Sequence, residues 1–273
     1  MPRSGCCLIL VLLLGTPCSG RAQSSIEGEA RAAALGGATT ALTHAPTGSA
    51  NPASWATFSG RAVSFFAFEA FGLAALRLAT AAYVEPTSLG AFAGGARTFG
   101  FDDYRETLVH GGFARSFGLG STRRFYAGLS LRYYFVSIPG YGKAGTLGMS
   151  LGGLVEVWPS VQVGFQATNI HAPKLGEREE LPRTLALGLA YAPTEQVLVV
   201  LDVYKDVRFP LSVRAGIEVR PVTPFALRAG AATEPSRFTA GAGVRLGKVV
   251  ADVAGERHAV LGWSPAVSFG LRW

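Results

Sequence analysis

Cysteine is almost missing from this chain. Its 273 residues include three cysteines, and all of them lie close to the N-terminus, at Cys6, Cys7 and Cys18. Beyond that point no thiol is available for a disulfide or for a cysteine-ligated metal. A chain of this length without disulfides must be stabilised by backbone hydrogen bonding and packing, and it is long enough for one large β domain.

The spacings that mark common catalytic and metal sites are also missing. The four histidines are His44, His110, His171 and His258. None stands in an H-x-x-x-H or HExxH pattern, and the chain has neither a G-x-S-x-G elbow nor a P-loop, so we expect no metal, no other cofactor and no enzyme. The alternative is a catalytic site at the rim of the fold, built from His110 or His258 and a nearby aspartate. Those aspartates are Asp102, Asp103 and Asp252. Single histidines at strand ends more often have interfacial or structural roles.

Long apolar runs and blocks of like charge are absent as well. The net charge is +7, but the basic residues are dispersed singly, which argues against nucleic-acid binding. Only 16% of residues are charged, which is low for a soluble exported domain. After residue 22 the most apolar stretch, Phe71–Val84, is interrupted by Arg77. A hydrophobic chain without a helical span predicts a closed β-barrel, because a barrel also satisfies every backbone polar group in lipid.

The first 22 residues have the features of a cleaved secretory signal peptide. Arg3 provides a positive start, Leu8–Leu14 is a short apolar core, and Gly20 and Ala22 are small residues at the expected cleavage site. A membrane anchor is the alternative, but the apolar core is too short to span a bilayer as a helix. A lipoprotein cleaved at Cys18 is less favoured, because the residues before it form a poor lipobox.

From about Arg61 onward, apolar and polar residues alternate in segments separated by turn residues. In 123–136 one face carries Phe125, Ala127, Leu129, Leu131, Tyr133 and Phe135, and the other carries Arg124, Tyr126, Gly128, Ser130, Arg132 and Tyr134. Such alternation is typical of a transmembrane β-strand with lipid outside and a lumen inside. A soluble β-sandwich or propeller would also alternate, but the polar faces here are as rich in glycine as in charge.

The alternating segments predict an all-β fold, a transmembrane antiparallel up-and-down barrel of about fourteen strands. We expect the strands near 61–69, 72–84, 88–99, 104–117, 123–137, 143–157, 160–169, 182–192, 196–207, 210–220, 223–232, 236–246, 247–257 and 264–273. The charged insert His171–Leu181 is expected to be an exposed loop. The predicted organisation is a signal peptide at 1–22, a hatch or plug segment at 23–60 and the barrel at 61–273.

The C-terminal segment ends on an aromatic residue. Phe269, Leu271 and Trp273 alternate with Ser268, Gly270 and Arg272, and the segment resembles the strand that the barrel-assembly machinery reads in outer-membrane proteins. We therefore interpret Phe269, Leu271 and Trp273 as an insertion signal. A last strand must also pair with the first to close a barrel.

The stretch before the first strand, Glu29–Trp55, is small, rich in alanine and glycine, and too weakly apolar to form a core helix. We call it the hatch and expect it in the mouth or lumen of the barrel. Gly36 and Gly37 allow a close approach to the wall, and Asn51-Pro52 favours a turn. Arg31 is a candidate partner for a carboxylate on the inner wall.

The charged residues expected to face the lumen are Arg124, Arg132, Asp202, Arg214, Glu218, Arg228, Arg245, Asp252 and Arg272, with Asp206 and Glu256 as further acidic candidates. We favour a ladder of charges that braces the wall over a solute-binding site.

The hatch carries a recognisable motif. Its residues are Arg31, Leu35, Gly36, Gly37, Asn51, Pro52 and Ala53. The segment resembles the N-terminal region of PorV/PorQ-type outer-membrane proteins and, more distantly, of FadL-type channels for hydrophobic compounds. The resemblance covers about 25 residues and implies a hatch inside a fourteen-stranded barrel of the bacterial outer membrane. Thr43–Ala50 departs from it, lacking the usual acidic pair and aromatic, and the chain is too short for large extracellular loops.

Two functions remain open at this point. One is a gated passive channel for small or hydrophobic solutes, opened by movement of the hatch; the other is a non-conducting docking component of a type IX-like protein secretion system. Inward glycines around a continuous gap, or a lateral opening at a strand kink, would indicate a channel. A tightly plugged lumen and an apolar outer rim would indicate docking. The expected partners are outer-membrane lipid, the barrel-assembly machinery, and either hydrophobic solutes or exported proteins.

Overall fold

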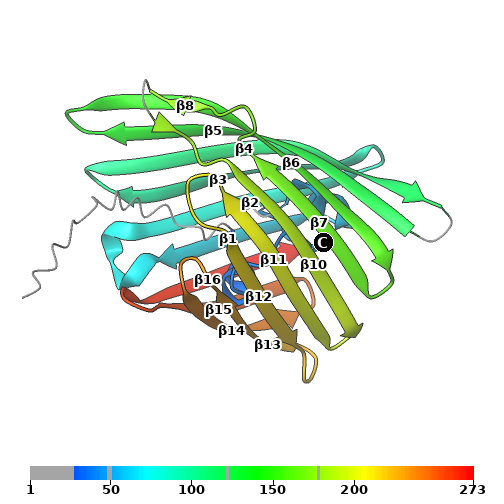
Figure 1. Cartoon of the computed structure of the whole chain (residues 1–273). Helices are drawn as coiled ribbons and strands as arrows, with labels where there is room; N and C mark the ends of the chain where they lie inside the picture. The colour runs from blue at the N-terminus through cyan, green and yellow to red at the C-terminus, as the bar shows by residue number, and fades with distance from the viewer. Residues whose placement is uncertain (1–27, 48–50, 121–122, 177–178) are drawn as a thin grey trace, which may run out of the picture.

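The computed structural model describes residues 28–47, 51–120, 123–176 and 179–273. The predicted signal peptide lies outside the described residues. The described chain forms one closed antiparallel barrel of fourteen strands, in which each strand pairs with its neighbours in the sequence and β1 pairs with β16 (Figure 1). The predicted fold class and strand number are confirmed.

The strands of the barrel are β1 (Ala62–Glu69), β2 (Arg77–Thr87), β3 (Gly90–Phe101), β4 (Tyr104–Leu119), β5 (Arg123–Ile138), β6 (Gly142–Trp158), β7 (Val161–Thr168), β10 (Thr184–Thr194), β11 (Val197–Asp206), β12 (Ser212–Val219), β13 (Phe225–Ala232), β14 (Arg237–Leu246), β15 (Val249–His258) and β16 (Gly262–Arg272). Each corresponds to one of the predicted strands. The second begins later than expected, because Ala70–Gly72 (η2) and Ala74–Leu76 (η3) form short 3₁₀ turns. Within η2, Phe71 has a φ of 56°, a left-handed conformation that is incompatible with a strand.

The predicted exposed loop at 171–181 is a small structured insert. It contains β8 (Lys174–Leu175) and β9 (Glu179–Glu180), which pair with each other outside the barrel sheet. Leu181 is buried and packs with Leu108 of β4 and Tyr134 of β5. The insert therefore covers part of the inner wall, and the expectation that it is simply exposed is wrong at its apolar positions.

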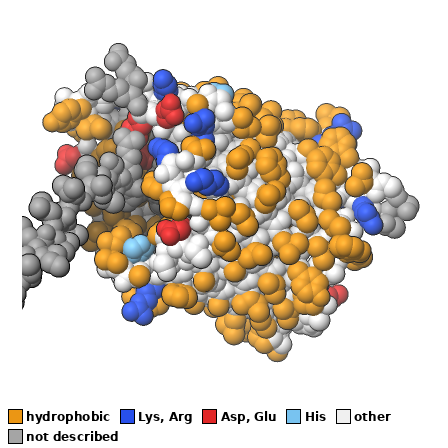
Figure 2. Space-filling model, viewed as in Figure 1, with side chains coloured by type: hydrophobic (Ala, Val, Ile, Leu, Met, Phe, Trp, Pro, Cys, Tyr) orange, Lys and Arg blue, Asp and Glu red, His pale blue; other side chains and the backbone are white. Residues whose placement is uncertain are grey.

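Alternation along the strands separates an apolar outer surface from a polar inner one. In β12, Ser212, Arg214, Gly216 and Glu218 are buried, whereas the alternating Val213, Ala215 and Ile217 are exposed. Figure 2 shows hydrophobic side chains over much of the outer wall, with most charged side chains of this face toward its ends. An apolar belt around a polar interior is the arrangement of a barrel whose outer solvent is lipid. Among the described residues, no helix is sufficiently long and apolar to cross a membrane.

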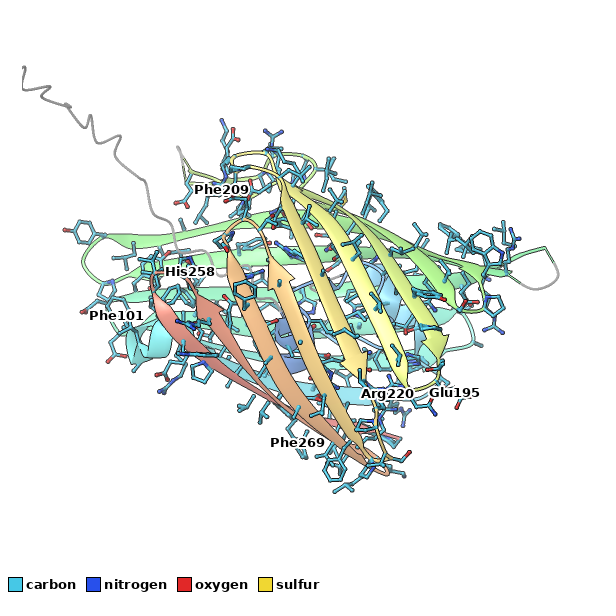
Figure 3. The ribbon with its side chains drawn as sticks, turned by 60° about the horizontal axis from the view of Figure 1, so that its bottom comes forward. Phe101, Glu195, Phe209, Arg220, His258 and Phe269 are labelled. Atoms are coloured by element: carbon cyan, nitrogen blue, oxygen red, sulfur yellow. The ribbon has the colours of Figure 1, made fainter. Side chains whose placement is uncertain are left out.

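The two ends of the barrel differ. The backbones of Arg61 and Trp273 exchange two hydrogen bonds, of 2.8 and 3.0 Å, where the chain enters and leaves the wall. We call this the terminal end and the opposite one the distal end. Figure 3 shows Glu195 and Arg220 at the terminal end and Phe101 and His258 at the distal end. The turns at the terminal end are short, and the insert with β8 and β9 lies at the distal end.

Strand pairing is incomplete at two places on the distal end. The ladder between β6 and β7 begins at Ser150, so the distal part of β6 has no partner on β7. Asn169 and His171 lie there, with contacts to the backbone oxygens of Met149 and Leu147. The ladder between β1 and β16 likewise stops at Ala266, and the Phe71 amide donates to the Ser264 hydroxyl beyond it.

The hatch lies inside the barrel. It begins with a one-turn helix, α1 (Ala30–Ala34), and ends in a 3₁₀ helix, η1 (Pro52–Thr57), which leads into β1. Both helices are seen within the ring of strands in Figure 1. Leu35 and Trp55 are completely buried, and apolar clusters join the hatch to inward-facing residues such as Tyr126 and Leu154. The hydrophobic core of this protein is thus the boundary between hatch and wall.

Candidate functional site: the hatch and its contacts with the lumen

Glycines on the inner wall make room for the hatch. An ideal Cβ placed on any of eight wall glycines would lie within 3 Å of hatch atoms. These are Gly112, Gly128, Gly152, Gly164, Gly188, Gly216, Gly230 and Gly241. They come from eight different strands, and the ladder sets several side by side: Gly128 opposite Gly152, Gly164 opposite Gly188, and Gly216 opposite Gly230.

This arrangement revises the sequence-based interpretation of the inward glycines. They do not line an open gap in this structure, because the hatch backbone fills the space that side chains would take. At Gly216 a Cβ would approach the Leu35 carbonyl oxygen to 2.7 Å, and at Gly112 it would lie 2.5 Å from the Trp55 ring. Side chains at these positions would displace the hatch.

Gly36 and Gly37 turn the hatch along the wall. Their φ angles of 69° and 76° lie in the left-handed region, which glycine adopts at little cost. The Gly36 amide donates to Thr239 Oγ1 at 3.0 Å, and the Thr239 hydroxyl donates to the Ala34 carbonyl at 2.9 Å. The double glycine therefore allows both the turn and the close contact with β13 and β14.

Asn51 links the two halves of the hatch to the wall. Its amide nitrogen Nδ2 lies within hydrogen-bond distance of the carbonyls of Thr40, Gly153 and Phe165, at 2.7, 3.1 and 3.2 Å. Its Oδ1 accepts from the Ala53 amide at 3.0 Å and so caps η1. Asn51 is completely buried. Pro52 occupies the first turn of η1, where a missing amide hydrogen costs nothing.

Asp202 of β11 holds the middle of the hatch. Its Oδ2 accepts from the amides of Thr39 and Thr40 and from the Thr40 hydroxyl, at 2.7, 2.9 and 2.8 Å. Asp202 is 2% exposed. Three donors from two consecutive hatch residues thus meet one buried oxygen of the wall, so Asp202 anchors the middle of the hatch to β11.

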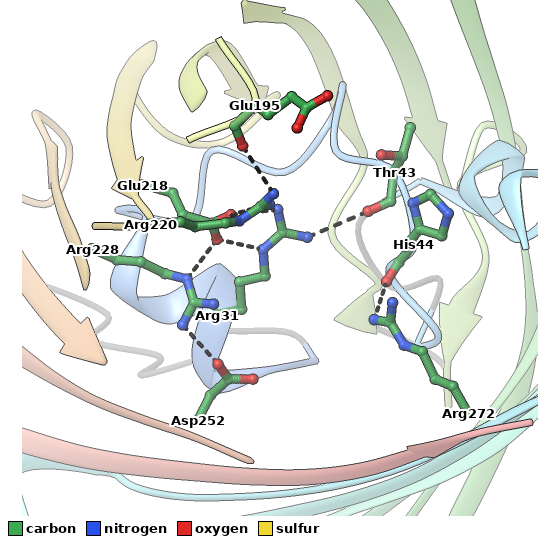
Figure 4. A network of polar contacts seen from close by, with 9 residues as sticks. All are labelled: Arg31, Thr43, His44, Glu195, Glu218, Arg220, Arg228, Asp252 and Arg272. Atoms are coloured by element: carbon green, nitrogen blue, oxygen red, sulfur yellow. Dashed lines mark hydrogen bonds and ion pairs between the residues drawn. The ribbon is translucent and has the colours of Figure 1, made fainter. Parts of the chain in front are cut away.

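A network of charges ties α1 to the barrel (Figure 4). Glu218 of β12 accepts from Arg31 at 2.8 Å, from Arg220 at 2.6 Å and from Arg228 at 2.6 Å. Arg228 continues the network to Asp252 of β15 at 2.7 Å. Burial by itself would lower the pKa of Arg31, but the adjacent Glu218 carboxylate raises it above the usual value.

A second group of charges lies farther along the lumen. Arg237 is 3.6 Å from Glu256, and the Arg214 guanidinium lies 3.6 Å from the centre of the Tyr204 ring. Arg214 and Arg237 also approach the carbonyls of Gly37 and Gly36, at 3.3 and 3.4 Å. These contacts surround the double glycine of the hatch with cations that face its carbonyl oxygens.

A cavity of about 250 Å³ lies between the hatch and the wall at the terminal end. Glu29 and Arg31 of the hatch contribute to it, together with residues from β12 to β16 and from β1. Burial raises the pKa of the Glu29 carboxyl to about 7, against the opposing effect of Arg272 and Arg31.

The structure places the residues proposed from the sequence as follows. Buried wall charges are Arg132, Asp202, Asp206, Arg214, Glu218, Arg228, Asp252 and Glu256. Arg124 and Arg245 lie toward the strand ends and are exposed, and Arg272 is partly buried. Phe269 and Trp273 are exposed on the outer surface, and Leu271 is paired with Val63. No cluster of three or more His, Cys, Asp or Glu suited to a metal ion occurs in the described part of the chain.

Sequence reasoning missed several contacts of the hatch. It assigned no role to Thr40, Trp55 or Thr239, although Trp55 stacks on His110 with ring centres 6.3 Å apart. His110 was considered for catalysis at the rim or for an interfacial or structural role at a strand end, and it is buried beneath Trp55 of the hatch. One feature of the sequence could have revealed these contacts. The inward faces of the strands are rich in glycine, and glycine in a strand often marks a place where another backbone approaches closely.

The closed barrel of fourteen strands has counterparts among solved structures. No family model matches the sequence, and no curated protein matches it. Among solved structures, the chain is similar to the Ralstonia pickettii toluene transporter TbuX, with a TM-score of 0.64, 14% identity, and coverage of 90% of this chain and 99% of that one.

Two further structures extend this likeness. The Pseudomonas putida toluene transporter TodX has a TM-score of 0.59, 14% identity, and coverage of 90% and 96%. A Pseudomonas aeruginosa FadL homologue has a TM-score of 0.54, 13% identity, and coverage of 90% and 97%. At these identities the likeness shows the fold, and it extends over nearly the whole described chain.

Proposed function

We propose that this protein is a bacterial outer-membrane channel for small hydrophobic solutes, closed by its hatch in the conformation described. The observation that carries the proposal is the row of eight inward glycines beneath the hatch. Because these positions have no side chains, displacement of the hatch leaves a conduit along the wall. A barrel whose lumen was filled by the side chains of its own wall would carry large residues at these positions instead.

The likeness to two toluene transporters supports a hydrophobic solute. The incompletely paired ends of β6 and β16 support a lateral route near the distal end, since backbone there is covered by neighbouring segments and not by a complete strand ladder. We propose that a solute enters at the distal end, and that hatch movement decides whether it crosses.

The test is uptake of radiolabelled toluene by Gram-negative cells that express the full-length protein or a variant lacking Glu29–Trp55. The lipopolysaccharide leaflet slows free diffusion of hydrocarbon, so a channel gives a measurable increase. We expect uptake above background with the full-length protein and faster uptake with the deletion. Background uptake from both, with both proteins correctly inserted, rules the channel out.

A second candidate is the non-conducting docking component resembling PorV/PorQ-type proteins. Two observations favour it: the lumen is tightly filled, and apolar side chains are exposed at the distal end. Leu73, Val260 and Leu261 are 53%, 84% and 53% exposed. Docking would be supported if an exported protein co-purified with the wild type but not with Val260→Ser/Leu261→Ser. The support would be clearest if toluene uptake were also absent.

A further inference from the structure

The cavity at the terminal end is bounded on one side by wall residues that face the lumen. Strand register aligns four of these lining residues from neighbouring strands side by side, namely Ser64, Gly270, Val250 and Arg245. Alternation along β16 places Arg272 on the same inward face as Gly270. Apart from Val250, this part of the wall is therefore polar or lacks a side chain.

The hatch does not fill the space above Gly270. A Cβ placed on Gly270 would meet the Val63 carbonyl oxygen at 3.3 Å and the Val250 side chain at 4.0 Å. No described atom of the hatch lies within 4 Å of that position. The eight glycines beneath the hatch differ, because hatch atoms lie within 3 Å of the same point on each of them. Gly270 therefore borders a space of about 250 Å³ that the hatch leaves open.

Positive charge predominates around this cavity. Its lining includes five arginines and three carboxylates, which leaves an excess of two positive charges when every acid is ionised. The arginines are Arg31, Arg220, Arg228, Arg245 and Arg272, and the acids are Glu29, Glu218 and Asp252.

Two of the arginines lack a carboxylate partner. The first three pair with Glu218, and the third also pairs with Asp252. Within the described ranges, Arg245 and Arg272 form no ion pair with a carboxylate. Arg272 donates instead to the His44 carbonyl at 3.2 Å, and Figure 4 shows it apart from the arginines gathered at Glu218. The guanidinium groups of Arg245 and Arg272 are thus available to an anion in the cavity.

The size and charge of the cavity suit a small oxyanion. A guanidinium donates two parallel hydrogen bonds to a phosphate group in a planar geometry. A cavity of about 150 Å³ is sufficient for benzene, and inorganic phosphate has fewer heavy atoms than benzene, so it fits here together with water. A neutral hydrocarbon would leave the excess charge uncompensated. A lipid head group would approach from the outer surface, whereas Arg245 and Arg272 lie on the inward faces of their strands.

We propose that this cavity binds a small tetrahedral oxyanion of the type of inorganic phosphate, held by Arg245 and Arg272 of the wall and adjacent to Arg31 of the hatch. Because Arg31 belongs to the hatch, the bound anion adds an electrostatic link between hatch and wall. Binding is independent of the proposed channel, and only an effect of the anion on conduction rests on the proposed function.

The experiment is calorimetric titration of the purified full-length protein in detergent with inorganic phosphate at constant ionic strength. Arg245→Gln/Arg272→Gln removes the proposed contacts. Arg123→Gln/Arg257→Gln is the matched control, since it removes two exposed arginines that do not line the cavity. We expect phosphate to bind the wild type and the control alike, and the cavity variant about tenfold more weakly or not at all.

Hydrogen exchange of the backbone amides of α1 is a second measurement, and it does not depend on conduction. Phosphate should slow this exchange in the wild type and the control but not in the cavity variant, because the anion links Arg31 to the wall. Phosphate binding without any change in exchange would contradict the position of the anion next to the hatch.

Equal phosphate affinity in the cavity variant and the wild type would overturn the inference, as would no phosphate binding. Tighter binding of a short-chain phosphatidic acid would also overturn it, because the ligand would then be a lipid head group. Arg245→Lys/Arg272→Lys keeps the charge but loses the planar geometry, so intermediate affinity would support the site and show that weakening is not due to misfolding. Toluene uptake separates the two proposals: uptake without phosphate binding leaves the channel standing, and phosphate binding without uptake leaves the site standing.

Discussion

The guanidinium of Arg31, on the hatch, and the carboxylate of Glu218, on β12, form an ion pair of 2.8 Å across 187 positions of sequence. Glu218 is 1% exposed and also holds Arg220 and Arg228. One wall carboxylate therefore holds the start of the hatch and two arginines of the wall. Its loss should affect both the seating of the hatch, that is, its bound position in the lumen, and the stability of the barrel.

We expect Glu218→Gln to destabilise the protein. Three guanidinium groups would remain around a neutral amide, and breaking a buried ion pair costs about 3–5 kcal/mol. The free energy of unfolding in lipid vesicles should fall by an amount of this order, and channel openings in a planar bilayer should become more frequent. Glu85→Gln, which removes an exposed pair with Arg61, is the control and should cost less than about 1 kcal/mol. Equal effects of the two substitutions would contradict the role of the network.

Gly216→Ala tests the close fit between wall and hatch. The new methyl group would meet the Leu35 backbone at 2.7–2.8 Å, a separation that requires the hatch to move. We expect faster proteolysis of the hatch in the folded barrel and more frequent channel openings. Gly118→Ala is the matched control, because a Cβ there has no neighbour within 4 Å. If both variants behave as the wild type does, the inner glycines do not position the hatch.

Asn51 should tolerate neither truncation nor charge. Asn51→Ala leaves buried carbonyls without their donor, at a cost of about 1–3 kcal/mol. Asn51→Asp keeps the shape but places an acceptor against three carbonyl oxygens, so it should be the more harmful change. Hydrogen exchange of the hatch amides in the two variants measures this order, and greater protection in Asn51→Asp than in Asn51→Ala would contradict it.

Seating of the hatch should weaken as the pH rises. The Glu29 carboxyl has an ordinary pKa of 4.5, which burial in the seated hatch raises to about 7. Between pH 4.5 and pH 7 the Glu29 carboxyl is ionised when the hatch is released but protonated when the hatch is in the lumen. The bound position of the hatch is therefore most stable below about pH 4.5, and this stabilisation is lost as the pH rises through 7. Arg272, Arg31 and Arg228 oppose the shift and Asp252 adds to it.

The corresponding measurement is the frequency of channel openings between pH 5 and pH 8. It should rise with pH in the wild type, and the rise should be reduced in Glu29→Gln, which cannot titrate. A wild-type frequency that falls with pH, or an unchanged slope in Glu29→Gln, would show that this carboxyl does not govern seating.

The barrel could be predicted because its signal is local. A strand in lipid alternates with a period of two, and residues 123–136 show this on their own. The start of β2 was missed because Phe71 and Leu73 continue the apolar pattern while the backbone turns. The apolar residues of the insert at 171–181 were read as part of a charged loop, since their partners Leu108 and Tyr134 are distant in sequence.

The contacts of the hatch could be predicted only in outline. The motif indicated that Arg31 and Asn51 matter, but their partners depend on strand register and on how far the hatch enters the lumen. Asp202 and Glu218 were both expected to face inward, yet alternation cannot tell which of them meets Thr40 and which meets Arg31. The inward glycines were interpreted as lining an open gap. The sequence does not show that the space above them is filled by the hatch, a distant segment of the same chain.

A reversible crosslink between hatch and wall tests the central claim most directly. Cysteine is absent beyond Cys18, and a Cβ on Gly216 would lie 2.8 Å from that of Leu35, within about 1 Å of the usual disulfide separation of ~3.8 Å. In Leu35→Cys/Gly216→Cys we predict channel openings and toluene uptake only after reduction, and neither in the oxidised form. Equal conduction with the disulfide closed and open would show that movement of the hatch does not open the lumen.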